Sequence, residues 1–201
     1  MKKFKEDLKN GKKYELWFAN NFLNDFEINE NEDDFKKFDI LSESFSYEIK
    51  TDKQCFVYYR FGFEVSSYDK PSGIWATESD YWVTIVPIFN KVFILKVDDV
   101  KDFIKNNQEE CIVKNCGDNY KSRMILWDWD YFLKTIKEYK DTKIIDIKVP
   151  NLYGKGETRK LLNDFLRYYN REDREIRCNN NKRMEKHYSD VYKKINKNPY
   201  E

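Results

Sequence analysis

The feature that most constrains the fold is a run of three segments in which apolar and polar residues alternate: residues 35–41, 45–52 and 55–65. Alternation with a period of two is typical of β-strands that bury one face. In the second segment, Glu48 and Lys50 share one face of the predicted strand, and Tyr47 and Ile49 lie on the other. The pattern predicts successive strands whose apolar faces enter one core, with the polar residues gathered on the reverse side.

The rest of the first 150 residues predicts a mixture of helices and strands. Apolar residues recur at helical spacing in residues 12–26, which predicts an amphipathic helix. Further patterns predict strands at 81–89, 92–97 and 143–149, and helices at 98–106 and 130–139. Of the 201 residues, 40% are hydrophobic and 17% aromatic, which excludes an intrinsically disordered chain. We therefore expect an α/β fold with a central mixed β-sheet flanked by helices.

The last quarter of the chain differs from the rest in charge. Pro150, Gly154 and Gly156 mark a break, after which the pattern predicts two polar helices, at 158–176 and 181–196. Residues 151–201 hold 13 Lys and Arg against 8 Asp and Glu, whereas residues 1–150 hold 24 against 28. The net charge of +1 is thus the sum of an acidic core and a basic helical extension. It excludes a simple polycation but not a nucleic-acid partner.

Cysteine, histidine and hydropathy limit the cellular setting and the chemistry. No stretch of about 18 apolar residues occurs, so we expect no membrane span. Four cysteines without an apolar leader segment predict a reduced, intracellular, cytoplasmic protein. A zinc site formed by Cys111, Cys116, Cys178 and His187 is a weaker alternative to free, reduced cysteines. Only Cys111 and Cys116 are close in sequence, and a second closely spaced pair is missing. With a single histidine, catalysis would depend on carboxylates and lysines.

The candidate site combines acids with one lysine. Asp39 precedes Glu48 and Lys50 by one strand, and Glu15 lies on the apolar stripe of the preceding helix. Converging carboxylates can hold Mg²⁺ or Mn²⁺ through oxygen, and a nearby lysine can orient water and offset phosphate charge. These residue types suit metal-assisted phosphodiester hydrolysis. For Glu15 alone, a helix-dipole role in the first helical turn is the alternative.

Another acid–x–lysine pair competes with this one. Asp146 and Lys148 also lie on a predicted strand, but their upstream acids, Asp128 and Asp130, precede a helix rather than a paired strand. We therefore favour Glu48 and Lys50.

These residues resemble the PD-(D/E)xK nuclease superfamily. Asp39, Glu48 and Lys50 match its metal-binding acid, second acid and catalytic lysine, although Phe38 replaces the proline of the name. Glu15 looks like the helix-borne acid of archaeal Holliday-junction resolvases. A further block is similar to one in phage-type members: Ser72-Gly73-Ile74, then Thr77, Ser79, Asp80, Tyr81 and Trp82. The resemblance covers roughly residues 11–100.

The resemblance implies a restriction-endonuclease-like core and a metal-dependent endodeoxyribonuclease of viral or phage type. Its cofactor would be Mg²⁺ or Mn²⁺. Its substrate would be DNA, with Holliday junctions or other branched DNA among the candidates. A homodimer is a possible oligomeric state. Two alternatives stay open: a catalytically inactive nucleic-acid-binding or assembly protein on the same fold, and an RNA-directed endonuclease.

Several other residues are candidates for contacting nucleic acid. Ser72 and Thr77 can bond phosphate oxygens from a loop, with turn and cap chemistry as the alternative. Glu64 is a candidate further metal ligand, or a partner for Arg60. In the extension, a basic helical face could follow a phosphate backbone or be an ordinary solvated face; it comprises Lys160, Arg167, Arg171 and Arg174.

Overall fold

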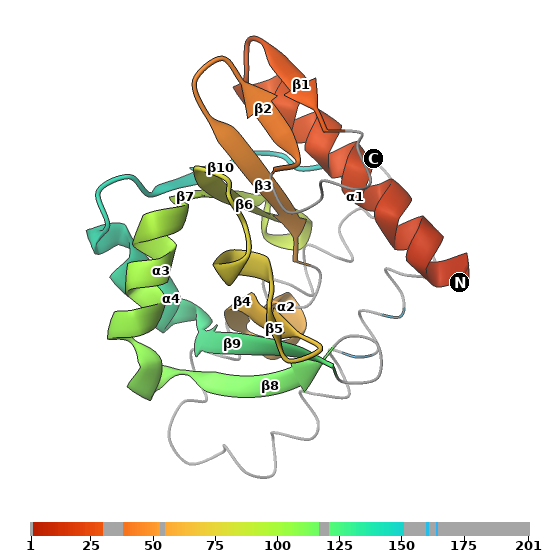
Figure 1. The fold of residues 1–201 in the computed structure, drawn as a ribbon. Coiled ribbons are helices and arrows are strands. Elements are labelled where there is room, and N and C mark those ends of the chain that lie inside the picture. Colours follow the sequence, from red (N-terminus) through yellow and green to blue (C-terminus); the bar gives the residue numbers. More distant parts are fainter. Residues whose placement is uncertain are drawn as a thin grey trace.

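The computed structural model describes residues 2–29, 38–52, 55–116 and 121–150, together with residues 160 and 164. These residues form two β-sheets with helices around them, and the predicted α/β class with a mixed central sheet is confirmed (Figure 1). Most of the basic extension, with Arg167, Arg171 and Arg174, lies outside the described residues. Lys160 is described, as an exposed helical residue. No helix among the described residues is long and apolar enough to cross a membrane.

The central sheet, sheet A, has six strands in the order β1-β2-β3-β6-β7-β10. Its strands are β1 (Phe26–Ile28), β2 (Ile40–Ser42), β3 (Ser46–Thr51), β6 (Tyr81–Val86), β7 (Lys91–Lys96) and β10 (Lys143–Asp146). Only β3 and β6 are parallel, and the other neighbours are antiparallel. The strands predicted at 45–52, 81–89 and 143–149 are therefore present but shorter, and the strand predicted at 92–97 is present one residue earlier.

The second sheet, sheet B, is antiparallel in the order β5-β4-β9-β8. Its strands are β4 (Arg60–Ser67), β5 (Lys70–Pro71), β8 (Ile112–Cys116) and β9 (Ser122–Asp128). The prediction of one strand over 55–65 is wrong in two respects. Residues Cys55–Tyr58 form a short helix, α2, which begins where the Asp52 carboxylate accepts the Cys55 N–H at 2.8 Å. The following strand, β4, then joins sheet B, and its apolar residues Phe61 and Phe63 enter a different core from Tyr47 and Ile49 of β3, so the expectation of one shared core is also wrong.

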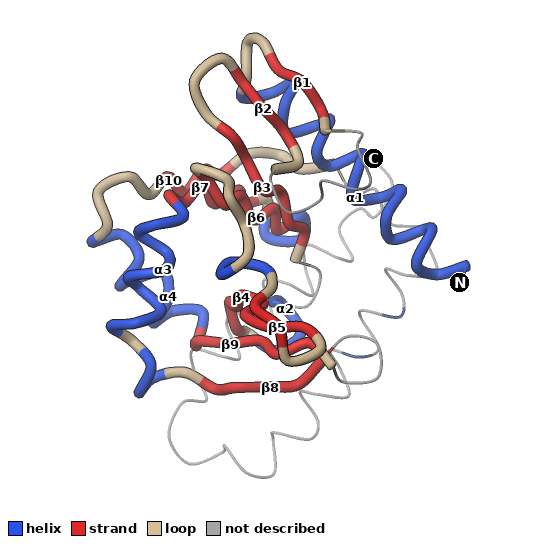
Figure 2. Tube along the Cα trace, in the orientation of Figure 1, coloured by secondary structure: helices blue, strands red, loops and turns tan. Residues whose placement is uncertain are grey.

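Helices cover both faces of sheet A (Figure 2). The longest, α1 (Lys2–Phe22), ends four residues earlier than predicted, because Phe26 begins β1. α3 (Val97–Asn106) and α4 (Trp129–Thr135) pack on the other side, near their predicted positions. Short 3-10 helices complete the connections: η2 (Gly73–Trp75), η3 (Pro87–Phe89), η4 (Gln108–Glu110) and η6 (Ile136–Glu138).

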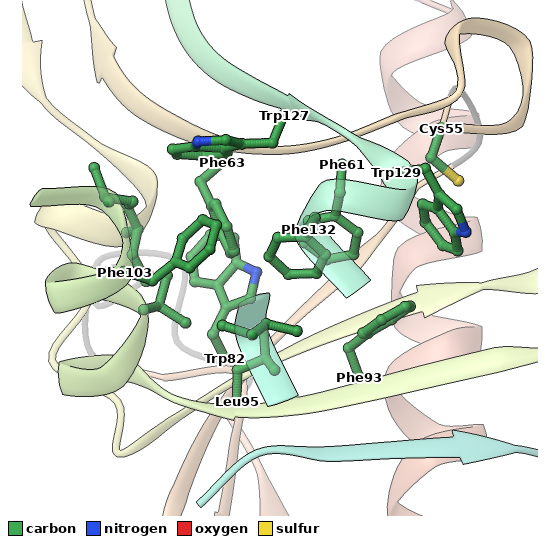
Figure 3. Packing of buried hydrophobic residues seen from close by; sticks show 14 of the residues in the cluster. Cys55, Phe61, Phe63, Trp82, Phe93, Leu95, Phe103, Trp127, Trp129 and Phe132 are labelled. Atoms are coloured by element: carbon green, nitrogen blue, oxygen red, sulfur yellow. The ribbon is translucent and has the colours of Figure 1, made fainter. Parts of the chain in front are cut away.

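Two apolar cores result. The larger lies between sheets A and B and is closed by α3 and α4; it is built largely from aromatic rings (Figure 3). Phe61 of β4 stacks on Phe132 of α4 with ring centroids 3.9 Å apart, and both are fully buried. The smaller core joins α1 to the opposite face of sheet A through Tyr14, Phe18 and Ala19. Packing of α1 on this face is what brings a helix-borne acid to β3.

Candidate metal centre

The candidate site begins where the pairing of β2 with β3 ends. The last pair is Ile40 with Tyr47, so residue 48 and those after it have no β2 partner. Asp39, the residue before β2, turns its carboxylate to this end and accepts the Ile49 N–H through Oδ2 at 2.7 Å. The side chain thus satisfies a strand N–H that the ladder leaves open, and this bond fixes the Asp39 carboxylate beside β3.

Lys50 connects the two acids predicted from the strand pattern. Its Nζ forms an ion pair with Glu48 Oε1 and lies 3.9 Å from Asp39 Oδ2. The alternation of β3 places Glu48 and Lys50 on one face, as the sequence predicts. The neighbouring strand β6 contributes Trp82, whose ring centroid is 5.7 Å from Lys50 Nζ. The ammonium therefore occupies the position between the carboxylates.

Glu48 is the most buried acid of the site, with 6% of its surface exposed. Its Oε2 accepts a hydrogen bond from the Thr77 hydroxyl at 3.5 Å, and the Thr77 oxygen in turn accepts the Ser79 N–H at 3.2 Å. Burial raises the pKa of Glu48, Lys50 lowers it, and the nearby Asp39 raises it further, with a net rise. Glu48 is thus held by a cation on one oxygen and a hydroxyl on the other.

Glu15 completes the cluster from α1. Burial raises its pKa from 4.5 to about 7, and the charge of Asp39 adds to the rise, while Lys50 and Lys12 oppose it. These mutual effects show that Glu15 is close enough to Asp39 and Lys50 for their charges to interact. Because α1 begins at Lys2, Glu15 is not in the first helical turn, and the helix-dipole alternative is wrong.

The protonation of Lys50 follows from the same arrangement. Desolvation alone lowers the pKa of Lys50, but the charges of Asp39 and Glu48 outweigh it, and the net pKa lies above the ordinary value of 10.5. Lys50 is therefore a cation at neutral pH, and the exposure of 45% of its side chain also favours the charged form. It is suited to donating hydrogen bonds and offsetting negative charge rather than to accepting a proton.

The donor set suits a hard divalent cation. Glu15, Asp39 and Glu48 offer only oxygen, which Mg²⁺ and Mn²⁺ prefer. With the side chains as they stand, no group of three or more His, Cys, Asp or Glu residues in the described ranges is arranged to hold a metal. At this site the ammonium of Lys50 lies between two of the acids, so their oxygens converge on a cation that the chain itself supplies.

Other predicted residues lie elsewhere. Ser72 donates to the Glu64 carboxylate at 2.5 Å, and Glu64 belongs to β4 of sheet B, so neither is part of the cluster just described. Thr77 is buried, with 8% exposed, and its hydroxyl is engaged by Glu48. The phosphate contacts predicted for Ser72 and Thr77 remain predictions.

The competing sites have structural roles. Asp146 pairs with Lys91 at 2.5 Å, and Asp128 caps α4 by accepting two backbone N–H groups. Of the zinc candidates, Cys111 donates its thiol hydrogen to the Gln108 carbonyl at 2.9 Å, and Cys116 lies at the far end of β8. Cys178 and His187 lie outside the described residues.

The sequence reasoning missed two neighbours of the site. Trp82 fills a strand position in the core, as the sequence predicts, but it also lies against Lys50. Thr77 donates its hydroxyl hydrogen to Glu48, a contact that the sequence pattern does not predict. Both contacts depend on the parallel pairing of β3 with β6, in which Glu48 lies opposite Trp82. No local pattern in the sequence predicts the parallel pairing of β3 with β6.

In comparisons with protein-family models, curated proteins and solved structures, no match to this chain was found.

Proposed function

We propose that this chain is a divalent-metal-dependent endonuclease that hydrolyses DNA phosphodiester bonds at the cluster of Glu15, Asp39, Glu48 and Lys50. The observation that carries the proposal is the single ammonium, Lys50 Nζ, shared by Asp39 and Glu48 beside a third acid. A cluster of this composition is what metal-assisted phosphoryl chemistry requires.

The chain order around the site supports a restriction-endonuclease-like core. The helix α1 is followed by three antiparallel strands, β1 to β3. The next strand of sheet A along the chain, after α2, β4, β5 and η2, is β6, which is parallel to β3. This order is compatible with the core that the sequence resembles. Branched DNA or a Holliday junction is the proposed substrate on the same resemblance, and a homodimer would allow paired cuts on two strands.

Glu15, Asp39 and Glu48 would hold Mg²⁺ or Mn²⁺, which would supply positive charge beside the scissile phosphate and its attacking water. In this proposal Lys50 leaves its ion pairs and donates to a phosphate oxygen or orients the water, because its raised pKa keeps it protonated. Thr77 keeps Glu48 in place by its hydrogen bond. The attacking water would lose a proton to solvent as its oxygen bonds to phosphorus, the P–O ester bond would break, and the leaving oxygen would take up a proton from solvent.

The test is cleavage of supercoiled plasmid and of a four-way junction with Mg²⁺ or Mn²⁺, with single-stranded RNA as a parallel substrate. We expect metal-dependent DNA products that Lys50→Ala and Asp39→Asn abolish. Lys96→Ala and Asp141→Asn are matched controls: Lys96 is equally exposed, at 45%, and pairs with Asp141 at 3.7 Å. Equal cutting by wild type and Lys50→Ala would defeat the assignment, and cutting of RNA alone would move it to an RNA-directed enzyme.

The Lys50 ion pairs also favour a second candidate function. Because Lys50 forms ion pairs with two of the acids without any metal, the cluster could be structural in a protein that binds nucleic acid without cutting it. This candidate requires that no metal-dependent product form and that Asp39→Asn leave nucleic-acid binding unchanged.

A further inference from the structure

A second surface lies on sheet B, at the turn between β4 and β5. We call this surface the hairpin tip, and it comprises Ser67, Tyr68, Asp69, Lys70, Lys121, Ser122 and Arg123. The register brings it together from three strands, because Ser67 of β4 pairs with both Lys70 of β5 and Ser122 of β9. The Tyr68 N–H donates to the Lys121 carbonyl at 3.0 Å, which ties the turn to the start of β9. Figure 1 shows this turn at one end of sheet B.

We propose that the hairpin tip binds an unpaired nucleic-acid strand, with Tyr68 stacking on a base and the surrounding cations contacting phosphates. This binding surface is separate from the candidate metal centre and does not require that the chain cleave anything.

The aromatic ring at the tip is presented to solvent at a conformational cost. Tyr68 is 60% exposed, more than any other large hydrophobic residue among those described. Its φ is 51°, and that of Asp69 is 59°, so both residues of the turn are left-handed. Two-residue hairpin turns of this kind usually use Asn or Gly, and a bulky residue there is strained. A strained turn that holds a ring in water points to a role in contact rather than in packing.

The groups around the ring are those that bind phosphate. Lys70, Lys121 and Arg123 are all exposed, and Asp69 is the one acid among the seven tip residues. Lys121 Nζ lies 4.5 Å from the centroid of the Tyr68 ring, so a cation and an aromatic face are presented side by side.

Hydroxyl groups add hydrogen-bonding capacity to the same surface. The Ser122 hydroxyl donates to the Ser67 hydroxyl at 3.5 Å between the two strands, and the Ser67 hydroxyl can in turn donate to a phosphate oxygen. Proteins that bind single-stranded nucleic acids commonly combine basic side chains, small hydroxyls and exposed aromatic rings. Every unpaired base has a face on which such a ring can stack. In a duplex the bases are already stacked, so the proposed ligand is an unpaired strand.

The experiment measures anisotropy of short fluorescein-labelled single-stranded and duplex oligonucleotides with the full chain in EDTA, where metal-dependent cleavage cannot occur. Tyr68→Asn removes the ring but suits the left-handed turn, so the variant should fold. We expect it to weaken single-strand binding by about tenfold or more, the effect of removing one stacked base. Tyr68→Phe should bind like wild type.

The chain provides a matched control in Tyr58, which lies under Lys114 at 5.6 Å but is only 37% exposed. Tyr58→Ala should leave binding unchanged. Lys121→Ala and Arg123→Ala should each reduce the slope of log K against log salt, by about 0.7 for each phosphate that the variant no longer neutralises.

Three results would overturn the inference: no single-strand binding by wild type, binding by Tyr68→Asn equal to wild type, or an equal loss with Tyr58→Ala. A preference for the duplex that Tyr68→Asn leaves intact would do the same. None of these results bears on the metal centre, which the Lys50→Ala cleavage assay tests separately.

Discussion

Replacing Glu15 by Gln should remove a loss of folding stability that wild type undergoes as the pH rises. Glu15 is held on α1 beside Asp39, and burial is the largest cause of the rise of its pKa to about 7. An ionised carboxylate in this position is disfavoured relative to the unfolded chain, where the pKa is near 4.5. Gln has nearly the same shape and never ionises, so it isolates the effect of the charge.

The direction and size of the effect follow from the two pKa values. Between about pH 4.5 and 7 the folded chain binds more protons at Glu15 than the unfolded chain does, so the free energy of unfolding falls as the pH rises through this window. At about 1.4 kcal/mol per pH unit, the full loss is about 3 kcal/mol. Because Glu15 is only partly buried, solvent screening reduces this, and we expect 1 to 3 kcal/mol, roughly.

The assay is urea unfolding of wild type and Glu15→Gln at about pH 4.5 and about pH 8, where linear extrapolation yields the free energy of unfolding. The variant should gain stability over wild type at the higher pH and lose that advantage at the lower. Glu110→Gln, on the exposed η4 turn, is the control and should follow wild type. Parallel pH profiles for wild type and Glu15→Gln would refute the raised pKa of Glu15 and, with it, the burial of this carboxylate in the cluster.

Three further substitutions test neighbouring parts of the structure. Under the proposed function, Thr77→Val should weaken Mn²⁺ binding severalfold by calorimetry, since about 1 kcal/mol is lost with the hydrogen bond to Glu48, whereas Thr77→Ser should retain it. Gly73→Ala should lower the free energy of unfolding by about 1 to 3 kcal/mol, because Gly73 has φ +53° and an added Cβ would collide with the Glu64 carbonyl oxygen. Phe132→Ala should cost about 3 to 5 kcal/mol in urea unfolding, because its ring is fully buried in the larger core.

The elements that could be predicted are those whose pattern is local. β3, β6 and β7 alternate or run apolar over their own length, and α3 has a clear apolar stripe. The failure at residues 55–65 shows the limit. Val57 and Tyr59 continue the alternation of Phe61 and Phe63, yet the Asp52 cap starts a helical turn. β4 then pairs with β9, whose paired residues lie 55 to 68 positions later, from Ser67–Ser122 to Arg60–Asp128. Strand pairing between segments so far apart in the sequence cannot be predicted from a local pattern.

The candidate site divides in the same way. The alternation of one strand places Glu48 and Lys50 on one face, so their ion pair could be expected. The position of Glu15 near β3 could be expected from the apolar stripe of α1, on which it lies. The position of Asp39 depends on the pairing of β2 with β3, which ends at Ile40, the residue after Asp39. The contact of Thr77 with Glu48 could not be foreseen, because it follows from the crossover between β3 and β6.

The electrostatics of the cluster show why it suits a bound cation. Two carboxylates share one ammonium beside a third carboxylate, so the four groups carry a net charge of −2 when all are ionised. The raised pKa values of Glu15 and Glu48 show that the fold resists this charge, since protons are held more tightly there than in water. A divalent cation would balance the negative charge of the carboxylates and so favour their ionised forms. It would therefore compete with protons for these carboxylates. Under the proposed function, Mn²⁺ affinity should therefore rise as the pH increases through about 7, where Glu15 gives up its proton. In Glu15→Gln, this rise should be smaller, and an unchanged pH dependence would separate Glu15 from the metal centre.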